Sequence, residues 1–318
     1  MVAKHIYSIL EQHRITFDID QCSISQGIQQ KPEHAQGVEA FIQQINTFVS
    51  HKTPLAFLVV GFPFKSKNIE KKVISTSADM AERKSLEYLN TIFQDISRIY
   101  EPGAHITIFC DGTFFGEFFD VTDDEISTYE ATLKKLSQDL AYITLITTQD
   151  MSHMILYNVD LKNAQKTMRN IVDSYPPNND DFITSIEYNL PETLKQRILL
   201  EFDYQEGKKI IQKKSVKDIA VKLMARQSRM RKFLDEIFSH NSIYGNHIRL
   251  TLHFSKYIDK KFGIRLSPDS CITPYHGTLV EEKNNKWSIK FKKDIDTNKY
   301  QQTSKIINGI PCAYFKAI

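Results

Sequence analysis

Apolar residues recur every three or four positions along several stretches of the chain, which is the spacing of one buried helix face. The pattern predicts helices over residues 35–50, 79–100, 123–140 and 215–239, and also over 1–20, 160–174 and 191–205. Asp79 with Glu82 three residues later is typical of a helix start. Pro102-Gly103 is typical of a helix end.

Short, continuous apolar runs between these helices predict buried strands. They lie at residues 55–61, 105–110 and 141–146, and an alternating run follows at 247–254. A helix between two buried strands implies parallel pairing with a right-handed crossover. Near the end, 277–282 and 287–292 flank a polar turn and predict a hairpin.

The expected fold is therefore α/β, a Rossmann-like layer of mostly parallel strands with flanking helices, plus a C-terminal helical and β-hairpin portion. The Pro- and Asn-rich stretch at 175–180 is the best linker candidate. It predicts a Rossmann-like domain over residues 1–175 and a second portion over 176–318 that completes the active site.

Charge and hydropathy exclude several classes of protein. The chain has 41 basic and 38 acidic residues, and a net charge of +3 does not select nucleic acid as a partner. A local basic excess between Lys208 and Lys232 predicts a solvated helix face, with a non-catalytic anion- or nucleic-acid-binding module as the alternative. With no apolar run of about 18 residues and no secretory signal, we expect a cytoplasmic protein without a membrane span.

The four cysteines, Cys22, Cys110, Cys271 and Cys312, do not form a C-x-x-C pair. The sequence therefore indicates neither a zinc site nor a thioredoxin-like motif, and no metal is expected. In a cytosolic chain such cysteines are expected to be reduced.

The turn from Gly61 to Asn68 directly follows the first apolar run. Ligands of open α/β sheets bind beyond the carboxyl ends of strands, which is where this turn is expected. Aromatic neighbours would desolvate Lys65 and lower its pKa toward base or imine chemistry. Lys65 also fits a phosphate-binding charge or a surface residue that closes a loop.

Other candidate residues follow the later strands. Asp111-Gly112 is either a turn dipeptide or an active-site carboxylate that holds an ammonium group. His253 shares a strand face with Arg249, and His276 lies in a turn after Tyr275. Histidine suits acid–base chemistry near neutral pH, although a single histidine in a strand or loop is more often structural.

Three arginines are candidates for an anion site. Arg226 and Arg229 are three residues apart on one predicted helix, so they project together. With Arg249 they would bind phosphate or carboxylate in fork geometry. The alternative is a set of separate surface ion pairs.

Four segments, in the same order, resemble the isonitrile (isocyanide) synthase family, which includes the fungal dityrosine-biosynthesis enzymes. They are residues 61–68, 79–112, 121–129 and 249–276. Phe-Pro-Phe-Lys-Ser at 62–66 and Tyr-x-Pro-Gly-Ala…Asp-Gly between 100 and 112 are the most specific. The resemblance spans residues 50–280, with few matching residues over 150–215.

The resemblance implies an enzyme that converts the α-amino group of a free aromatic amino acid, tyrosine first and tryptophan second, to an isonitrile. Ribulose 5-phosphate is the implied co-substrate and one-carbon donor, with no metal or redox cofactor. An iron- and 2-oxoglutarate-dependent oxygenase is the implied pathway neighbour. An N-formyl amino acid, associated with the fungal branch, is the alternative product.

That chemistry needs a phosphate anchor, an acid–base pair and a carboxylate anchor. We therefore predict Lys65 and His276 for proton transfer or imine support, and Asp111 for the substrate amine. The predicted substrate-binding residues are Ser66, Arg226, Arg229, Arg249, His253 and Tyr275.

Three positions depart from the family pattern. Cys110 stands where a serine is expected, Phe254 where a proline is usual, and Tyr275 where a tryptophan is common. The last two lie in predicted pocket segments, so the preference between amino acids stays open.

Overall fold

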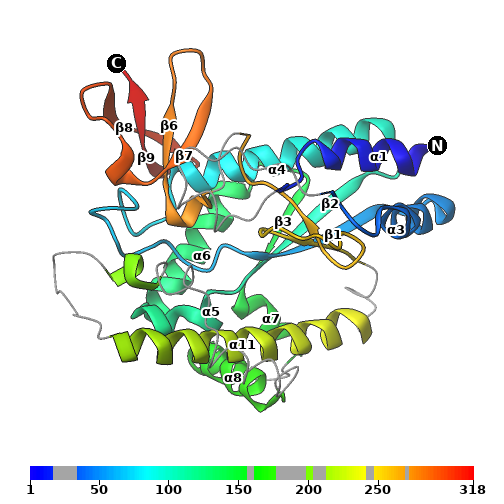
Figure 1. Cartoon of the computed structure of the whole chain (residues 1–318), viewed down its shortest axis with the longest axis horizontal. Coiled ribbons are helices and arrows are strands. Elements are labelled where there is room, and N and C mark those ends of the chain that lie inside the picture. The colour runs from blue at the N-terminus through cyan, green and yellow to red at the C-terminus, as the bar shows by residue number, and fades with distance from the viewer. Residues whose placement is uncertain (17–33, 156–160, 177–197, 203–212, 241–246, 269–271) are drawn as a thin grey trace.

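The computed structural model describes residues 1–16, 34–155, 161–176, 198–202, 213–240, 247–268 and 272–318 (Figure 1). The α-helices are α1 (Val2–Glu11), α3 (Val38–His51), α4 (Met80–Ile99), α5 (Gly112–Phe115), α6 (Asp123–Ser137), α7 (Thr148–Ile155), α8 (Leu161–Ser174) and α11 (Lys213–His240). The strands are β1 (Leu55–Gly61), β2 (Ala104–Cys110), β3 (Ile143–Ile146), β4 (Ile248–Thr251), β5 (Phe262–Gly263), β6 (Thr278–Glu281), β7 (Trp287–Lys290), β8 (Tyr300–Ile307) and β9 (Ile310–Ala317). The 3₁₀ turns are η1 (Gly116–Phe119), η2 (Pro274–His276) and η3 (Lys292–Asp294).

Five parallel strands form the larger sheet, in the order β3-β2-β1-β4-β5. β1 and β2 pair along their whole length, from Leu55 opposite Ala104 to Gly61 opposite Cys110. Because α4 connects them, the predicted strand–helix–strand unit is confirmed. The capping box predicted at its start is also present, since Asp79 and Glu82 bond reciprocally to each other's backbone.

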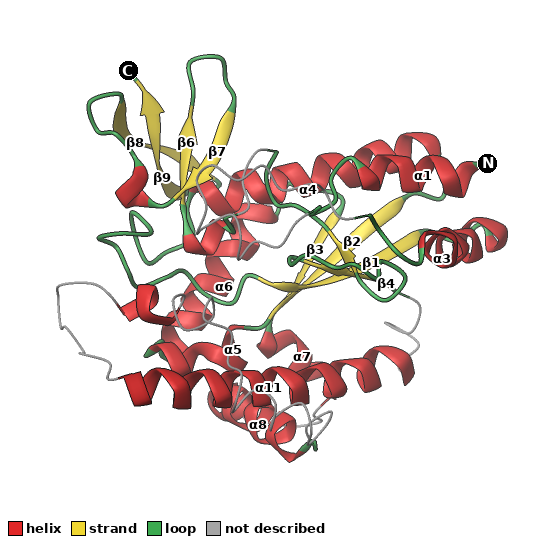
Figure 2. Cartoon of the chain, viewed as in Figure 1, coloured by secondary structure: helices red, strands yellow, loops and turns green. Residues whose placement is uncertain are grey.

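Helices cover both faces of this sheet, as Figure 2 shows: α1, α3 and α4 lie on one side, and α5, α7, α8 and α11 on the other. Apolar side chains from alternate strand positions fill each interface. Phe57 packs against Phe93 of α4, with ring centroids 5.1 Å apart. On the opposite face Leu58 and Phe109 join a core with Phe233 of α11. The predicted α/β class is therefore confirmed.

The smaller sheet has four strands in the order β7-β6-β9-β8. The predicted hairpin is confirmed as β6 and β7, which pair antiparallel. The sequence prediction omitted the second hairpin, β8–β9, although Asn-Gly is a strong hairpin signal. Asn308 and Gly309 form its turn with φ of 50° and 79°, a left-handed backbone that Asn and Gly adopt most readily.

Two predicted elements are shorter in the structure. The first helix ends at Glu11 rather than near residue 20, because the following backbone pairs with β5: the Ile15 amide donates to the Gly263 carbonyl at 2.9 Å. The alternating strand ends at Thr251 rather than Phe254. The larger sheet takes β4 and β5 from beyond residue 175, and the division of the chain at that residue stays a prediction.

The helices of the described segments include none with the length and apolar character needed to cross a membrane. The polar linker predicted at 175–180 lies outside the described residues from residue 177 onward. Of the helix predicted over 191–205, the described part is helical from residue 198 to 202.

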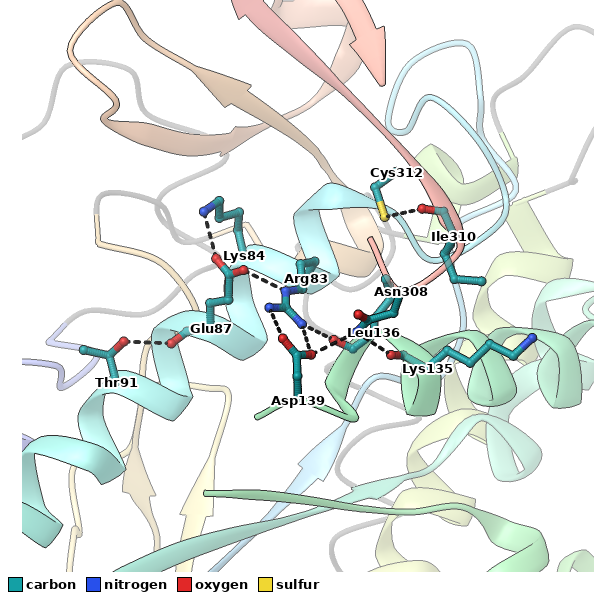
Figure 3. Close-up of polar contacts among 10 residues, drawn as sticks. All are labelled: Arg83, Lys84, Glu87, Thr91, Lys135, Leu136, Asp139, Asn308, Ile310 and Cys312. Carbon is teal, nitrogen blue, oxygen red and sulfur yellow. Dashed lines mark hydrogen bonds and ion pairs between the residues drawn. The ribbon is translucent and has the colours of Figure 1, made fainter. Parts of the chain in front are cut away.

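Hydrogen bonds connect the turn of the β8–β9 hairpin to α4 and to the end of α6 (Figure 3). Arg83 of α4 donates to both Asp139 carboxylate oxygens, at 2.6 and 2.9 Å. This bidentate pair holds the pKa of Asp139 well below its usual range. The Asn308 amide donates to Asp139 at 2.9 Å and to the Lys135 carbonyl, near the end of α6, at 3.0 Å. One aspartate thus joins α4, α6 and the smaller sheet.

Asn308→Gly is expected to lower the free energy of unfolding by about 1 kcal/mol, because it removes both side-chain hydrogen bonds while keeping the left-handed backbone. Asn308→Ala is expected to cost roughly 1 kcal/mol more, since alanine also strains that backbone. Urea denaturation of both variants measures the difference. Equal stability of the two variants would show that the backbone conformation contributes nothing here.

Candidate active site

The candidate site is built around the turn that follows β1. Phe62 is fully buried and has a left-handed backbone (φ 56°), a strained conformation for an aromatic residue. Its ring contacts Tyr275 at a centroid distance of 5.8 Å. A Cβ atom at Gly112 would lie 1.9 Å from the Pro63 carbonyl oxygen, so the Asp111-Gly112 segment packs directly on this turn. The segments that follow β1 and β2 are therefore in direct contact.

Lys65 is buried, and its ammonium group lies among acceptors from the start of α4 and from the η2 turn. It donates to both Glu82 carboxylate oxygens, at 2.9 and 2.8 Å, and to the Pro274 carbonyl at 2.9 Å. Asp79 Oδ1 lies 3.1 Å away. An ammonium group has three N–H donors, so protein acceptors occupy all of them.

The expected lowering of the Lys65 pKa is wrong. Burial alone lowers the pKa, but the carboxylates of Asp79 and Glu82 outweigh it, and the pKa is raised above its ordinary value. Lys65 is thus a permanently charged centre of an ion pair. Its role in proton transfer or imine formation stays a prediction.

Glu82 is the other half of this pair and is completely enclosed. Besides Lys65 it accepts from the Asp79 backbone amide at 2.9 Å and from the Tyr129 hydroxyl at 3.2 Å. Burial pushes the pKa of Glu82 upward, and the Lys65 charge opposes that shift. Three donor groups, which make four hydrogen bonds to one carboxylate, compensate for much of its desolvation.

A second polar group lies on the other side of the same turn. The Ser66 hydroxyl donates to Glu201 Oε2 at 2.6 Å. Glu201 Oε1 pairs with the Lys72 ammonium group and lies 3.1 Å from His276 Nδ1. Lys72 Nζ is also 3.1 Å from that nitrogen. One carboxylate therefore joins a hydroxyl, an ammonium group and an imidazole.

The η2 turn brings these two polar groups together. The Pro274 carbonyl accepts from Lys65, and the next carbonyl, that of Tyr275, accepts from the Ser66 amide at 2.9 Å. His276 is the last residue of η2 and its side chain is 38% exposed, against 11% for Glu201. The imidazole is therefore the solvent-facing member of the second group.

Asp111 lies immediately after β2, within the packed edge of the site. Burial raises its pKa to about 7, and its Oδ1 atom has no hydrogen-bond partner among the described residues. The structure thus supports a buried carboxyl group that titrates near neutral pH. Its predicted contact with a substrate amine stays a prediction.

The three predicted arginines do not gather in one place. Arg226 binds both oxygens of Asp173, at 3.0 and 2.6 Å, and Arg229 lies 3.8 Å from the same carboxylate. Arg249 donates to Asp235 at 2.9 Å. Arg226 and Asp235 are nine residues apart on α11, which is about 13 Å along its axis. Arg226 and Arg229 therefore lie together at one carboxylate, as their spacing predicted, while Arg249 forms a separate ion pair.

Arg249 belongs instead to another cationic group. β4 and β5 place Leu250 opposite Phe262, so Arg249 and Lys261, one residue earlier on each strand, lie side by side. Burial lowers the pKa of Lys261 to about 8, and the charges of Arg231 and Arg249 add to the effect. This group has three cations and, in Asp235, one carboxylate.

The remaining predicted residues have different outcomes. Ser66, Tyr275 and His276 are brought together, as described above. His253 lies beyond the end of β4, where its carbonyl oxygen would be 2.7 Å from a Cβ atom at Gly263. Sequence reasoning missed Lys72 and Glu201, which had no motif or periodic position to mark them. Glu82 was recognised as a helix cap but not as the partner of Lys65.

No arrangement of three or more His, Cys, Asp or Glu side chains suited to a metal ion occurs within the described segments. Cys110 and Cys312 are both buried thiols.

The chain is similar in sequence and in fold to known proteins. A sequence model described as pyoverdine/dityrosine biosynthesis protein matches residues 45–303. L-tyrosine isonitrile synthase of Pseudomonas aeruginosa is 26% identical over 272 residues, 80% of each chain. L-tryptophan isonitrile synthase AmbI2 of Fischerella ambigua is 28% identical over 251 residues, 75% of this chain and 72% of that protein. The crystal structure of PvcA from Pseudomonas aeruginosa has the same fold over the whole of both chains, with a TM-score of 0.78 at 22% identity.

Lys65→Met is expected to lower the free energy of unfolding by about 3–5 kcal/mol, because it leaves two carboxyl groups buried without their cation. The double variant Lys65→Met/Glu82→Gln should recover part of this loss. Urea denaturation of the single and double variants measures both. A cost below about 1 kcal/mol for Lys65→Met would contradict a structural role for the pair.

The raised pKa of Asp111 predicts a pH dependence of stability. Between pH 4 and pH 7 the folded state binds more protons at this group than the unfolded state, so stability falls as pH rises. Each pH unit in that window costs up to about 1.4 kcal/mol. Asp111→Asn should make the decline shallower in urea titrations at pH 5, 6 and 7; parallel declines in variant and wild type would refute the raised pKa.

Proposed function

We propose, from the premise that this chain belongs to the pyoverdine/dityrosine biosynthesis protein family, that it is an isonitrile synthase. The family model covers most of the chain, and the resemblance seen in the sequence is confirmed. The substrate we propose is a free aromatic amino acid, tyrosine first and tryptophan second. The names of two relatives, a tyrosine and a tryptophan isonitrile synthase, support an aromatic amino acid as the substrate.

The observation that carries the proposal is the hydrogen-bonded group of Ser66, Lys72, Glu201 and His276 beyond the carboxyl end of β1. A carboxylate that orients an imidazole is a common arrangement for proton transfer. Nδ1 of His276 either donates to Glu201 or accepts from Lys72, each at 3.1 Å; the proposal takes the first tautomer, which leaves Nε2 to take up a proton. Glu201 would stabilise the imidazolium that forms.

Ribulose 5-phosphate is the one-carbon donor in this proposal. The amino group of the amino acid attacks the sugar ketone and loses water to give an imine, and the sugar then fragments so that one carbon remains on nitrogen. The first step needs a base for the amine and an acid for the departing hydroxyl. His276 serves as both: Nε2 takes the proton from the amine and then gives it to the departing hydroxyl, while Glu201 stabilises the imidazolium between the two steps.

The cationic group of Arg231, Arg249 and Lys261 supports a phosphate anchor. Arginine and lysine side chains supply the positive charge and the N–H donors that bind a phosphate monoester. The arginines Arg226 and Arg229 already share Asp173, so they offer less charge to a ligand. This pairing also weakens the case for a nucleic-acid-binding face on α11.

The reaction is tested by incubating the full chain with ribulose 5-phosphate carrying carbon-13 at the ketone, together with tyrosine and tryptophan. We expect labelled isonitrile from one of the two amino acids, detected by mass spectrometry. Labelled N-formyl amino acid alone would favour the fungal-type product. Folded protein without label transfer would contradict the proposal.

Glu201→Gln is expected to lower the rate of label transfer at least about 100-fold, the usual loss when an acid–base group is disabled. Glu281→Gln on β6 is the matched control, because that carboxylate lies in the smaller sheet and pairs only loosely with Lys316, at 3.7 Å. Equal rates for Glu201→Gln and the control would remove Glu201 from the mechanism.

A further inference from the structure

Four buried polar side chains lie in segments that meet near the carboxyl ends of β2 and β3, apart from the Lys65 and Glu201 groups. They are Asp111, Thr113, Glu130 and Thr148, with exposed fractions of 9%, 0%, 4% and 0%. Asp111 Oδ1, Thr113 Oγ1, Glu130 Oε1 and Thr148 Oγ1 make no hydrogen bond within the described part of the chain. Buried polar atoms are nearly always satisfied, so four together indicate a missing ligand.

Strand register explains why these residues are neighbours. β2 and β3 are parallel with Phe109 opposite Ile146, so two residues later Asp111 is level with Thr148. Adjacent strands are about 4.8 Å apart. The Thr148 backbone amide bonds to Glu130, which α6 directs toward the same edge. Thr113 follows Asp111 in the first turn of α5.

The charges of this cluster are unbalanced. Among the described residues, neither Asp111 nor Glu130 forms an ion pair. Burial raises the pKa of Glu130 to about 8, only partly offset by the Thr148 amide. The nearest lysine to influence it, Lys134, lies in an ion pair with Asp150 at 2.6 Å. Two buried carboxyl groups without a cation are costly unless one stays protonated or a cation binds.

We propose that Asp111, Thr113, Glu130 and Thr148 form a binding site for a small monovalent cation. Carboxylate and hydroxyl oxygens are suitable ligands for a hard cation or for the three N–H donors of an ammonium group. A single positive charge matches the cluster, because both carboxyl groups cannot ionise cheaply at once in a buried site. The cation is either a free inorganic ion or the ammonium group of a substrate; only the second source rests on the proposed function.

The test is the melting temperature of the full chain at pH 8 in chloride salts of equal ionic strength. Potassium, ammonium and methylammonium are compared with tetramethylammonium, which is too bulky and has no N–H donors. A site filled to ten times its Kd is expected to raise Tm by roughly 2–4 °C. A gain with potassium identifies an inorganic ion, and a gain with ammonium or methylammonium alone identifies an amine. Equal Tm in all four salts overturns the proposal, as does a larger gain in a fifth sample that contains magnesium chloride at the same ionic strength.

Variants locate the effect in this cluster. Glu130→Gln and Thr148→Val are expected to abolish the difference between salts, whereas Thr148→Ser keeps the hydroxyl and should retain it. Glu281→Gln serves as the control. At pH 5 the difference in Tm between salts should vanish, because Asp111 and Glu130 are then protonated. The other titratable groups near this cluster are Cys110, Lys134 and Asp150. A salt difference that survives in both Glu130→Gln and Thr148→Val would place the cation elsewhere.

Discussion

The ammonium group of Lys65, buried between Glu82 and Asp79, is the contact on which the candidate site depends. It joins the turn after β1, the first turn of α4 and, through the Pro274 carbonyl, the η2 turn. A buried pair of this kind contributes little net stability against an apolar replacement, but breaking one partner is expensive. The constraint therefore fixes the relative position of three segments that are distant in the sequence.

Residues next to this ion pair carry the solvent-facing chemistry. Ser66 directly follows Lys65, and His276 follows Pro274 by two residues, so a rigid pair holds both. Glu201 then bridges them from a separate helical segment. The two groups differ in their surroundings: protein acceptors enclose the Lys65 ammonium group, whereas the His276 imidazole is partly exposed to solvent.

The buried charged groups of this protein are balanced at one place and unbalanced at another. At Lys65 the protein supplies carboxylates for a buried cation, but at Asp111 and Glu130 it supplies carboxyl groups without one. On the far face of the sheet, Arg249 and Lys261 lie side by side with one carboxylate between several cations. Excess charge of each sign at separate places fits a protein that binds more than one charged group.

The sequence by itself determined the elements whose signals are local. Asp79 and Glu82 start α4, apolar runs form β1 and β2, and the order of strand, helix and strand made them parallel. Only the tertiary structure decided which charges meet, because Lys65 finds acceptors 17 and 209 residues away and Ser66 finds Glu201 135 residues away. The predicted pKa of Lys65 was wrong for this reason: burial can be inferred from neighbouring aromatic residues, but the sign of a pKa shift depends on partners that only folding brings close.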